Sequence, residues 1–201
     1  MKKMMVFVGL LFLATAAFAQ ESRQDISLSG IAVAGPQVYG NTVTQTSTIS
    51  GGFLGSYRYM VTPRSALEVN YGWAHNSQKF QTAQLGAVAP VYVHTRQQEL
   101  TGAYVYTRNY RNFNPFLEVG IGALIFTPLS DYGTQQLDLK QNTNVGGLAG
   151  AGLAYEISPS FDIRLEYRGF IAKAPTFNSS NFKTNRYEWF SIPAIGIAYH
   201  F

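Results

Sequence analysis

Alternation of apolar residues with polar or small ones, over segments long enough to cross a membrane, constrains this chain more than any other feature. In 161–168 (FDIRLEYR) every second residue is apolar and those between are charged. Segments 65–73 and 115–125 alternate in the same way, with glycine in place of several charges. A repeat of two is that of a β-strand with one apolar face. The sequence therefore predicts an all-β protein.

Eight segments of this kind follow one another: 25–35, 47–61, 65–76, 95–108, 115–127, 144–157, 161–172 and 186–201. Each is close to or above the roughly 9–11 residues that a tilted transmembrane strand needs. Short connections at 62–65, 109–114 and 158–160 alternate with long polar ones at about 36–46, 77–94, 128–143 and 173–185. This asymmetry predicts an eight-stranded antiparallel up-and-down transmembrane β-barrel with both termini in the periplasm.

The N-terminus predicts export. Lys2 and Lys3 precede the apolar run 4–13, and Ala17-Phe18-Ala19 then gives a small-x-small cleavage signature. The apolar run is too short to span a bilayer. We therefore expect a signal peptide at 1–19 and one outer-membrane β-barrel domain at 20–201.

Composition excludes several classes of function. The chain has no cysteine, which rules out disulfides and thiolate chemistry. Its formal net charge of +4 includes the two leader lysines, and no basic run suggests nucleic acid. We expect no cofactor.

Aromatic residues indicate which face meets lipid. Many on the apolar faces lie near the short turns, as an interfacial girdle would: Tyr57, Tyr59, Tyr104, Tyr106, Tyr155, Phe161, Tyr199 and Phe201. The apolar face should therefore point outward, and the face with charges and glycine should line the lumen.

Charged residues on the inward faces predict a network inside the barrel. Arg58 should lie roughly opposite Glu68, and Glu156 roughly opposite Arg164. Eight strands leave an interior just wide enough for side chains, where opposite charges have to pair. We expect a structural plug of salt bridges; a gated or ion-selective pore is the alternative. The predicted members are Arg58, Glu68, Glu118, Glu156, Arg164, Glu166 and Arg168.

The Gly-rich strands, the Thr-Pro and Ser-Pro turns, the Leu-Glu-Val-Asn-Tyr strand and the terminal Phe201 together resemble the OmpA-like and OmpX-like small outer-membrane β-barrels. The resemblance implies an outer-membrane location. It also implies that Ile197, Tyr199 and Phe201 form part of the signal read by the outer-membrane assembly machinery. That superfamily includes structural anchors, adhesins, small porin-like proteins and a few lipid-modifying enzymes.

Candidate chemistry is sparse. His75-Asn76-Ser77 resembles the His-x-Ser element of outer-membrane lipid A deacylases, with Glu99 as the candidate acid, but it lies in the third strand instead of a later one. His75 and His94 flank the second long loop, yet two histidines without a nearby carboxylate make a weak metal site. We expect neither catalytic nor metal-binding residues and no enzyme activity.

The long loops suggest the function. Lys173, Lys183 and Arg186 could contact lipopolysaccharide phosphates, although ordinary loop solubility explains them equally well. We expect a structural or surface-interaction protein, adhesin-like and in contact with outer-membrane lipid and lipopolysaccharide, with a possible extracellular ligand bound through the loops. The alternatives are a small porin-like channel and, third, a lipid A-modifying enzyme.

Overall fold

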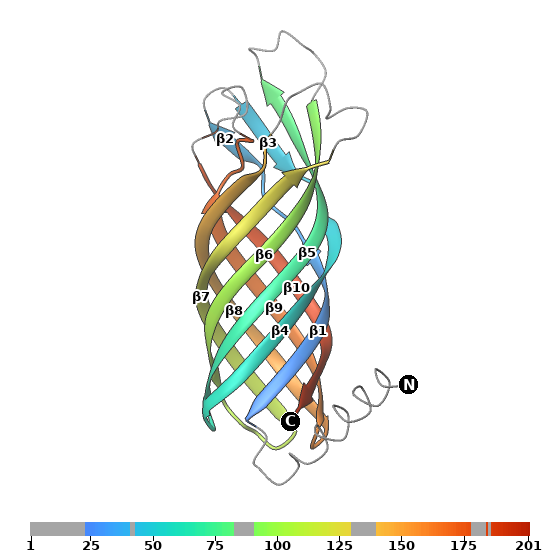
Figure 1. Ribbon diagram of the computed structural model, residues 1–201, viewed down its shortest axis with the longest axis vertical. Helices are drawn as coiled ribbons and strands as arrows, with labels where there is room; N and C mark the ends of the chain where they lie inside the picture. Colours follow the sequence, from blue (N-terminus) through green and yellow to red (C-terminus); the bar gives the residue numbers. More distant parts are fainter. Residues whose placement is uncertain (1–22, 41–42, 83–90, 130–139, 178–183, 185) are drawn as a thin grey trace, which may run out of the picture.

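The computed structural model describes residues 23–40, 43–82, 91–129, 140–177, 184 and 186–201, which form a tall barrel (Figure 1). The predicted signal peptide lies outside these residues and stays a prediction. The strands are β1 (Gln24–Val33), β2 (Val38–Gly40), β3 (Val43–Ser47), β4 (Ser50–Thr62), β5 (Ser65–Thr82), β6 (Val91–Thr107), β7 (Phe113–Pro128), β8 (Asn142–Ser158), β9 (Phe161–Lys173) and β10 (Tyr187–His200).

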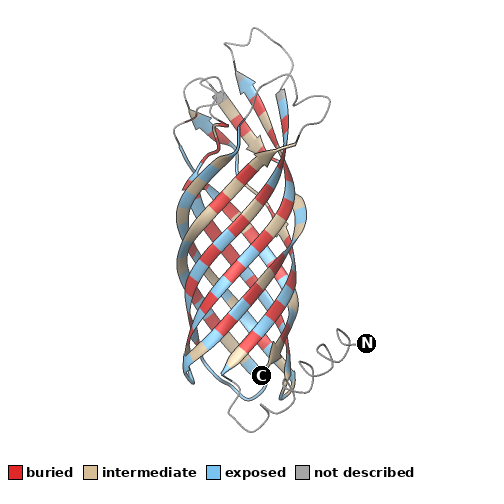
Figure 2. Cartoon of the chain, in the orientation of Figure 1, coloured by how far each residue is buried: buried red, intermediate tan, exposed pale blue. Residues whose placement is uncertain are grey.

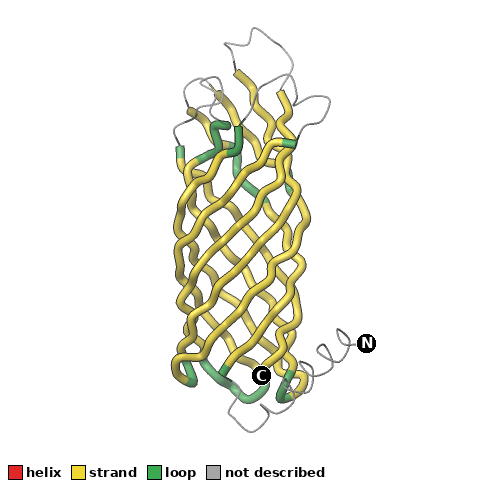
Figure 3. Tube along the Cα trace, viewed as in Figure 1, coloured by secondary structure: helices red, strands yellow, loops and turns green. Residues whose placement is uncertain are grey.

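Eight of these strands close into an antiparallel barrel. Neighbours around the wall are β4, β1, β10, β9, β8, β7, β6 and β5, and pairing of β5 with β6 completes the ring. The first and last strands meet in a seam that runs from Asp25↔His200 to Ile31↔Ala194. The predicted eight-stranded barrel is thus confirmed (Figure 3).

The described residues contain no helix that is long and apolar enough to cross a membrane.

The first long connection differs from the prediction of a plain loop. Strands β2 and β3 form a hairpin there, and β3 pairs with the upper part of β5 from Val43↔Thr82 to Ser47↔Gln78. The segment alternates Thr with other residues and contains Val43, and β-branched residues favour strands. The polar residues of this segment predict a loop when all of them are assumed to face water. In the structure one face of the hairpin lies against the interior, where Gln45 is fully buried.

Burial alternates along every barrel strand, which produces the banding of Figure 2. Outward residues at mid-strand are apolar and exposed, such as Ile121 at 72% and Leu165 at 58%. Tyrosine hydroxyls find polar partners at both edges of this apolar belt. Near the short turns Tyr57 donates to Gln24 at 2.6 Å, and toward the long loops Gln98 donates to Tyr71 at 2.6 Å. Amphipathic rings anchored in this way mark the two membrane interfaces.

The interior is divided into two halves. Most of the buried charges lie in the half near the short turns, whereas the half near the long connections holds a buried apolar cluster, including Leu124, Phe126, Phe170 and Phe190, together with a few buried polar side chains. The alternation of residues along a strand determines which side chains point into the barrel, but it does not determine how polar each half of the interior is.

The burial pattern predicts a depth-dependent cost for charge on the outer surface. We expect Ile121→Arg, at the middle of β7, to lower the free energy of unfolding by about 2–4 kcal/mol, because the guanidinium would enter the lipid core. The matched change Ile157→Arg, beside the short turn after β8, should cost about 0–1 kcal/mol. Reversible urea unfolding in lipid vesicles measures both. Equal costs would show that the outward face is not the lipid face.

Candidate functional site

The first element of the lumen is an ion pair within one hairpin. Arg58 on β4 and Glu68 on β5 are register partners, and Arg58 Nη2 lies 2.6 Å from Glu68 Oε2. Both side chains are almost completely buried. The Arg58 guanidinium also lies over the Phe116 ring, 4.8 Å from its centroid. A buried pair of this kind is costly to break, because the remaining charge has no water to solvate it.

A second pair crosses from β9 to β1. Arg164 donates from Nη1 and Nη2 to the two Asp25 carboxylate oxygens at 3.0 and 2.7 Å. The predicted pairing of Arg164 with Glu156 is wrong: Glu156 lies opposite Asp162, and Ala154 lies opposite Arg164. Asp25 is fully buried and takes both guanidinium donors, whereas Glu156 sits two residues closer to the turn and is only half-buried. The fork-like bidentate contact is the stronger arrangement.

The third element gathers three carboxylates around one guanidinium. Arg168 lies 3.0 Å from an oxygen of Glu99, of Glu118 and of Glu166. Its Nε hydrogen is donated to Glu118, and the Glu166 oxygen near the same nitrogen has no hydrogen bond among the described residues. Gly150 makes this approach possible, because a Cβ there would collide with the Glu118 side chain.

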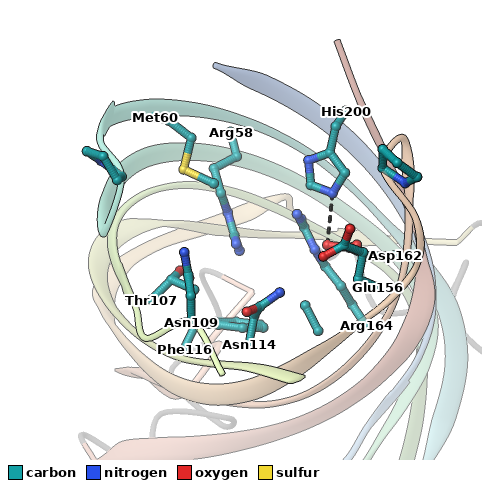
Figure 4. Close-up of a pocket in the computed structure, with 13 residues that line it drawn as sticks. Arg58, Met60, Thr107, Asn109, Asn114, Phe116, Glu156, Asp162, Arg164 and His200 are labelled. Carbon is teal, nitrogen blue, oxygen red and sulfur yellow. Dashed lines mark ion pairs between the residues drawn. The ribbon is translucent and has the colours of Figure 1, made fainter. Parts of the chain in front are cut away.

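Below these pairs the lumen opens to the short-turn side through a cavity of about 200 Å³ (Figure 4). At its rim His200 Nε2 lies 2.8 Å from an Asp162 oxygen, and Glu156 also lines the opening. Arg58 and Arg164 line it as well. The cavity is therefore a polar vestibule bordered by the ion pairs.

Above the ion pairs, aromatic side chains and an amide network fill the lumen. The Phe80 and Phe177 rings meet edge to face at 6.2 Å, and the inward amides of Gln45 and Gln78 are hydrogen bonded at 3.0 Å. Glu188 is also buried here, and neither of its oxygens has a hydrogen-bond partner among the described residues. Large side chains thus occupy the barrel on both sides of its middle.

Charges are segregated between the inside and the outside. All eight acidic residues in the described ranges either are buried or, in the case of Glu156, line the vestibule. Of the described cations, only Arg58, Arg164 and Arg168 are buried. The others lie at the two ends of the apolar belt: Arg23, Arg64, Arg108 and Arg111 at the short turns, and Lys79, Arg96, Lys140, Lys173 and Arg186 at the long connections.

The His-x-Ser element lies on the outer surface of the wall. Ser77 is the register partner of His94, and Ser77 Oγ lies 2.8 Å from His94 Nδ1. Glu99, the acid considered from the sequence, is on the opposite, inward face of β6 at Arg168, so it cannot complete a site with Ser77. In the part of the chain that the structure describes, no group of three His, Cys, Asp or Glu residues could hold a metal ion.

Sequence reasoning missed several members of the lumen network. Asp25, Glu99, Asp162 and His200 belong to it or to its rim. The alternation of Asp25 with Ile26 and Leu28 already places Asp25 inward, but Asp25 is the first residue of the predicted segment 25–35, where the alternation is weakest as a signal. The placement of Lys183, one of the predicted lipopolysaccharide contacts, lies outside the described residues, while Lys173 and Arg186 are exposed.

Comparison with known proteins identifies outer-membrane β-barrels as similar to this chain. The model of the outer membrane protein beta-barrel domain family matches residues 5–201. A search of curated proteins finds no match. Among solved structures, OprG of Pseudomonas aeruginosa superposes with a TM-score of 0.63 at 12% identity, over 90% of this chain and 97% of that one.

Two further barrels are similar in shape. Neisserial surface protein A has a TM-score of 0.59 at 13% identity, covering 90% of this chain and 98% of its own. Ail of Yersinia pestis, in complex with the heparin analogue sucrose octasulfate, has a TM-score of 0.56 at 15% identity, covering 90% and 100%. At these identities the likeness shows the fold.

The Arg58–Glu68 pair gives a test of the lumen network. We expect Arg58→Met and Glu68→Met each to lower the free energy of unfolding by about 3–5 kcal/mol, because each leaves a buried charge alone. The double variant should recover most of this loss, since it leaves no charge behind. Urea unfolding in lipid vesicles measures the three values.

The same vesicles report whether the lumen is closed, through the leak of trapped ions. Arg58→Met combined with Ile157→Met is the control, and its two effects should add, because Ile157 points to lipid. Strict additivity of the Arg58 and Glu68 changes would refute an energetically coupled network. Large, reproducible openings of the unaltered protein in planar bilayers would refute a closed lumen.

Proposed function

The chain belongs to the outer membrane protein beta-barrel domain family, and we propose that this outer-membrane barrel serves as a surface-interaction protein with a closed lumen, whose extracellular end contacts lipopolysaccharide. The observation that carries the proposal is the segregation of charge. The described part of the outer surface holds exposed cations at both membrane interfaces and no acidic side chain.

This distribution of charge suits a protein that spans a membrane with phosphate-bearing headgroups on both surfaces. Lys173 at the end of β9 and Arg186 before β10 are adjacent, because the Ala174 amide donates to the Arg186 carbonyl oxygen at 2.9 Å. Cations at this level can form charge-assisted hydrogen bonds with the phosphates of lipopolysaccharide. Arg64 and Arg108 occupy the corresponding level of the inner leaflet. We include Lys183 in the proposed outer contact on sequence grounds.

The filled lumen favours this proposal over a porin-like channel. An ion would have to pass Arg168 with its three carboxylates and then the Phe126 and Phe190 rings. These two rings are in contact, with their centroids 5.9 Å apart, and both are fully buried. The enzyme alternative has less support, because Glu99, the acid considered for Ser77, points into the lumen and away from Ser77. Ail was solved with a polyanionic sugar analogue, and a ligand of that charge would suit the cationic exterior of this chain.

Lipopolysaccharide binding tests the proposal. Replacing Lys79, Arg96, Lys173 and Arg186 together by Gln should weaken binding to lipopolysaccharide strongly, because each change removes a charge that can meet a phosphate. Binding of the unaltered protein should also weaken as salt is raised from low to physiological concentration and beyond. Protein in phosphatidylcholine nanodiscs, titrated with rough lipopolysaccharide, provides the measurement.

Arg64→Gln/Arg108→Gln is the matched control for that experiment, since it removes exposed charge from the opposite interface. It should bind as the unaltered protein does. Binding that ignores both salt and the four extracellular charges would overturn the proposal.

The C-terminal residues are proposed as the signal for the assembly machinery. Tyr199 and Phe201 stack with ring centroids 6.0 Å apart, and the Phe201 amide donates to the Gln24 carbonyl oxygen at 2.9 Å across the seam. Ile197 lies on the same outward face. The signal would therefore lie along the strand that closes the barrel.

Deleting Phe201 should reduce incorporation into the outer membrane and leave more chain in the periplasm, because the terminal aromatic is then absent from the signal. Cell fractionation measures the two pools. Phe113→Ala is the control: it removes an aromatic residue, 52% exposed, from the same girdle without altering the C-terminus. Equal incorporation of the deletion variant and the control would remove Phe201 from the signal.

A further inference from the structure

The outer wall is interrupted at one place near the extracellular interface. The uppermost pair of β4 with β5 is Gly52↔Ala74, and the pairing of β3 with β5 begins at Ser47↔Gln78. Between them, residues 75–77 have no register partner on that side of β5, and the chain at 48–51 crosses there, held by the Thr48 amide, which donates to the Ser77 carbonyl oxygen at 3.0 Å. A pocket of about 460 Å³ lies there, within the range of about 300–1,000 Å³ usual for small-molecule sites.

Outward-facing His75, Ser77 and His94 line the pocket on the lipid-facing side of the wall, and the buried Asn76 and Thr95 line it as well. Its height in the membrane follows from the order of outward side chains along β5. Outward residues below it are apolar, and next come Tyr71 and Trp73 at the edge of the apolar belt. Above them His75 and Ser77 line the pocket. The pocket is therefore at the depth of the outer-leaflet headgroups, where an aromatic belt gives way to polar residues.

Its lining has polar groups suited to a sugar. The Ser77 hydroxyl is hydrogen bonded to His94, and the Thr48 hydroxyl to the Ser77 backbone. Ile49, exposed at 79%, and Leu129 add apolar contact.

Cations flank the pocket on adjacent strands. Arg96 is the register partner of His75, and Lys79 lies two residues above Ser77, with its ammonium 6.0 Å from the centroid of the Tyr92 ring. Every acidic side chain of the described chain is buried in the lumen or lines the vestibule at the other end, so none opposes these charges. Lysine and arginine at this level are suited to phosphate.

We infer that this pocket between β4, β5 and β6 binds the phosphorylated sugar headgroup of an outer-leaflet glycolipid. Arg96 and Lys79 contact the phosphate, and the Thr48 and Ser77 hydroxyls meet the sugar. The acyl chains run down the apolar face past Trp73, which stacks on Phe53 at 5.5 Å. The inference rests on the proposed function and deepens it, because it assigns a saturable headgroup site to the β5–β6 wall and leaves to Lys173 and Arg186 the contacts with lipopolysaccharide molecules around the rim.

Trp73 can report on the site, since its ring lies 4.5 Å from that of His75. The chain has two tryptophans, so Trp189→Phe leaves Trp73 alone. The Trp189→Phe variant is placed in phosphatidylcholine nanodiscs and titrated with lipid A while the fluorescence of Trp73 is followed. Native mass spectrometry counts the bound lipid A independently. We expect saturable binding that changes the fluorescence.

The comparison is between two double charge removals. Lys79→Gln/Arg96→Gln should weaken lipid A binding about tenfold or more, the scale of a lost hydrogen bond to a charged group. Lys173→Gln/Arg186→Gln removes the same charge from another part of the rim and should change binding less than about twofold. Lipid A without its phosphates should bind as weakly to the unaltered protein as lipid A does to the first variant. Circular dichroism verifies that both variants fold.

Each other outcome overturns the inference. If the Lys173/Arg186 variant loses binding and the Lys79/Arg96 variant does not, the site is wrong while the surface function stands. If dephosphorylated lipid A or phosphatidylglycerol binds as tightly as lipid A, the pocket does not recognise a phosphorylated sugar. If mass spectrometry finds no bound lipid A on the unaltered protein, the inference and the proposed function both fail.

Discussion

Everything in this molecule depends on the pairing of the first strand with the last. In a lipid environment an unpaired backbone amide or carbonyl has no water to bond with, so a sheet can span the membrane only if it has no open edge. The β1–β10 ladder removes that edge. Backbone bonds between Gln24 and Phe201 extend the seam to the end of the chain. The aromatic girdle then fixes the depth of the closed ring.

Closure creates a narrow interior, and that interior determines where charge can go. Carboxylates placed inside need partners, and the three buried arginines pair with five of them: one acid for Arg58, one for Arg164 and three for Arg168. With the described acids confined in this way, the outer surface is left to cations. The same arrangement that fills the lumen thus leaves exposed cations at both ends of the barrel.

Much of the architecture could be predicted, because period two decides both the strand and the face. Leu165 and Arg164 are assigned to opposite sides from the sequence alone. The partners of a charge could not be predicted as well: Arg164 binds Asp25, which is 139 residues away and becomes a neighbour only when the ring closes. The wall pocket is harder still. It depends on where β4 stops pairing with β5 and β3 begins to pair with it. The polar sequence of the first long connection predicts a loop there and gives no sign of β3.

The hairpin formed by β2 and β3 has a consequence for how molecules of this protein meet one another. The upper part of β5 stands above the apolar belt, and without β3 beside it residues 78–82 would present unpaired backbone groups to the solvent. Such a row is a template on which a strand from another molecule can add. The hairpin covers it and moves the boundary of the sheet to β2, which is only three residues long. A short outer strand offers little length for addition, so crowded barrels in one membrane can stand close together without fusing their sheets.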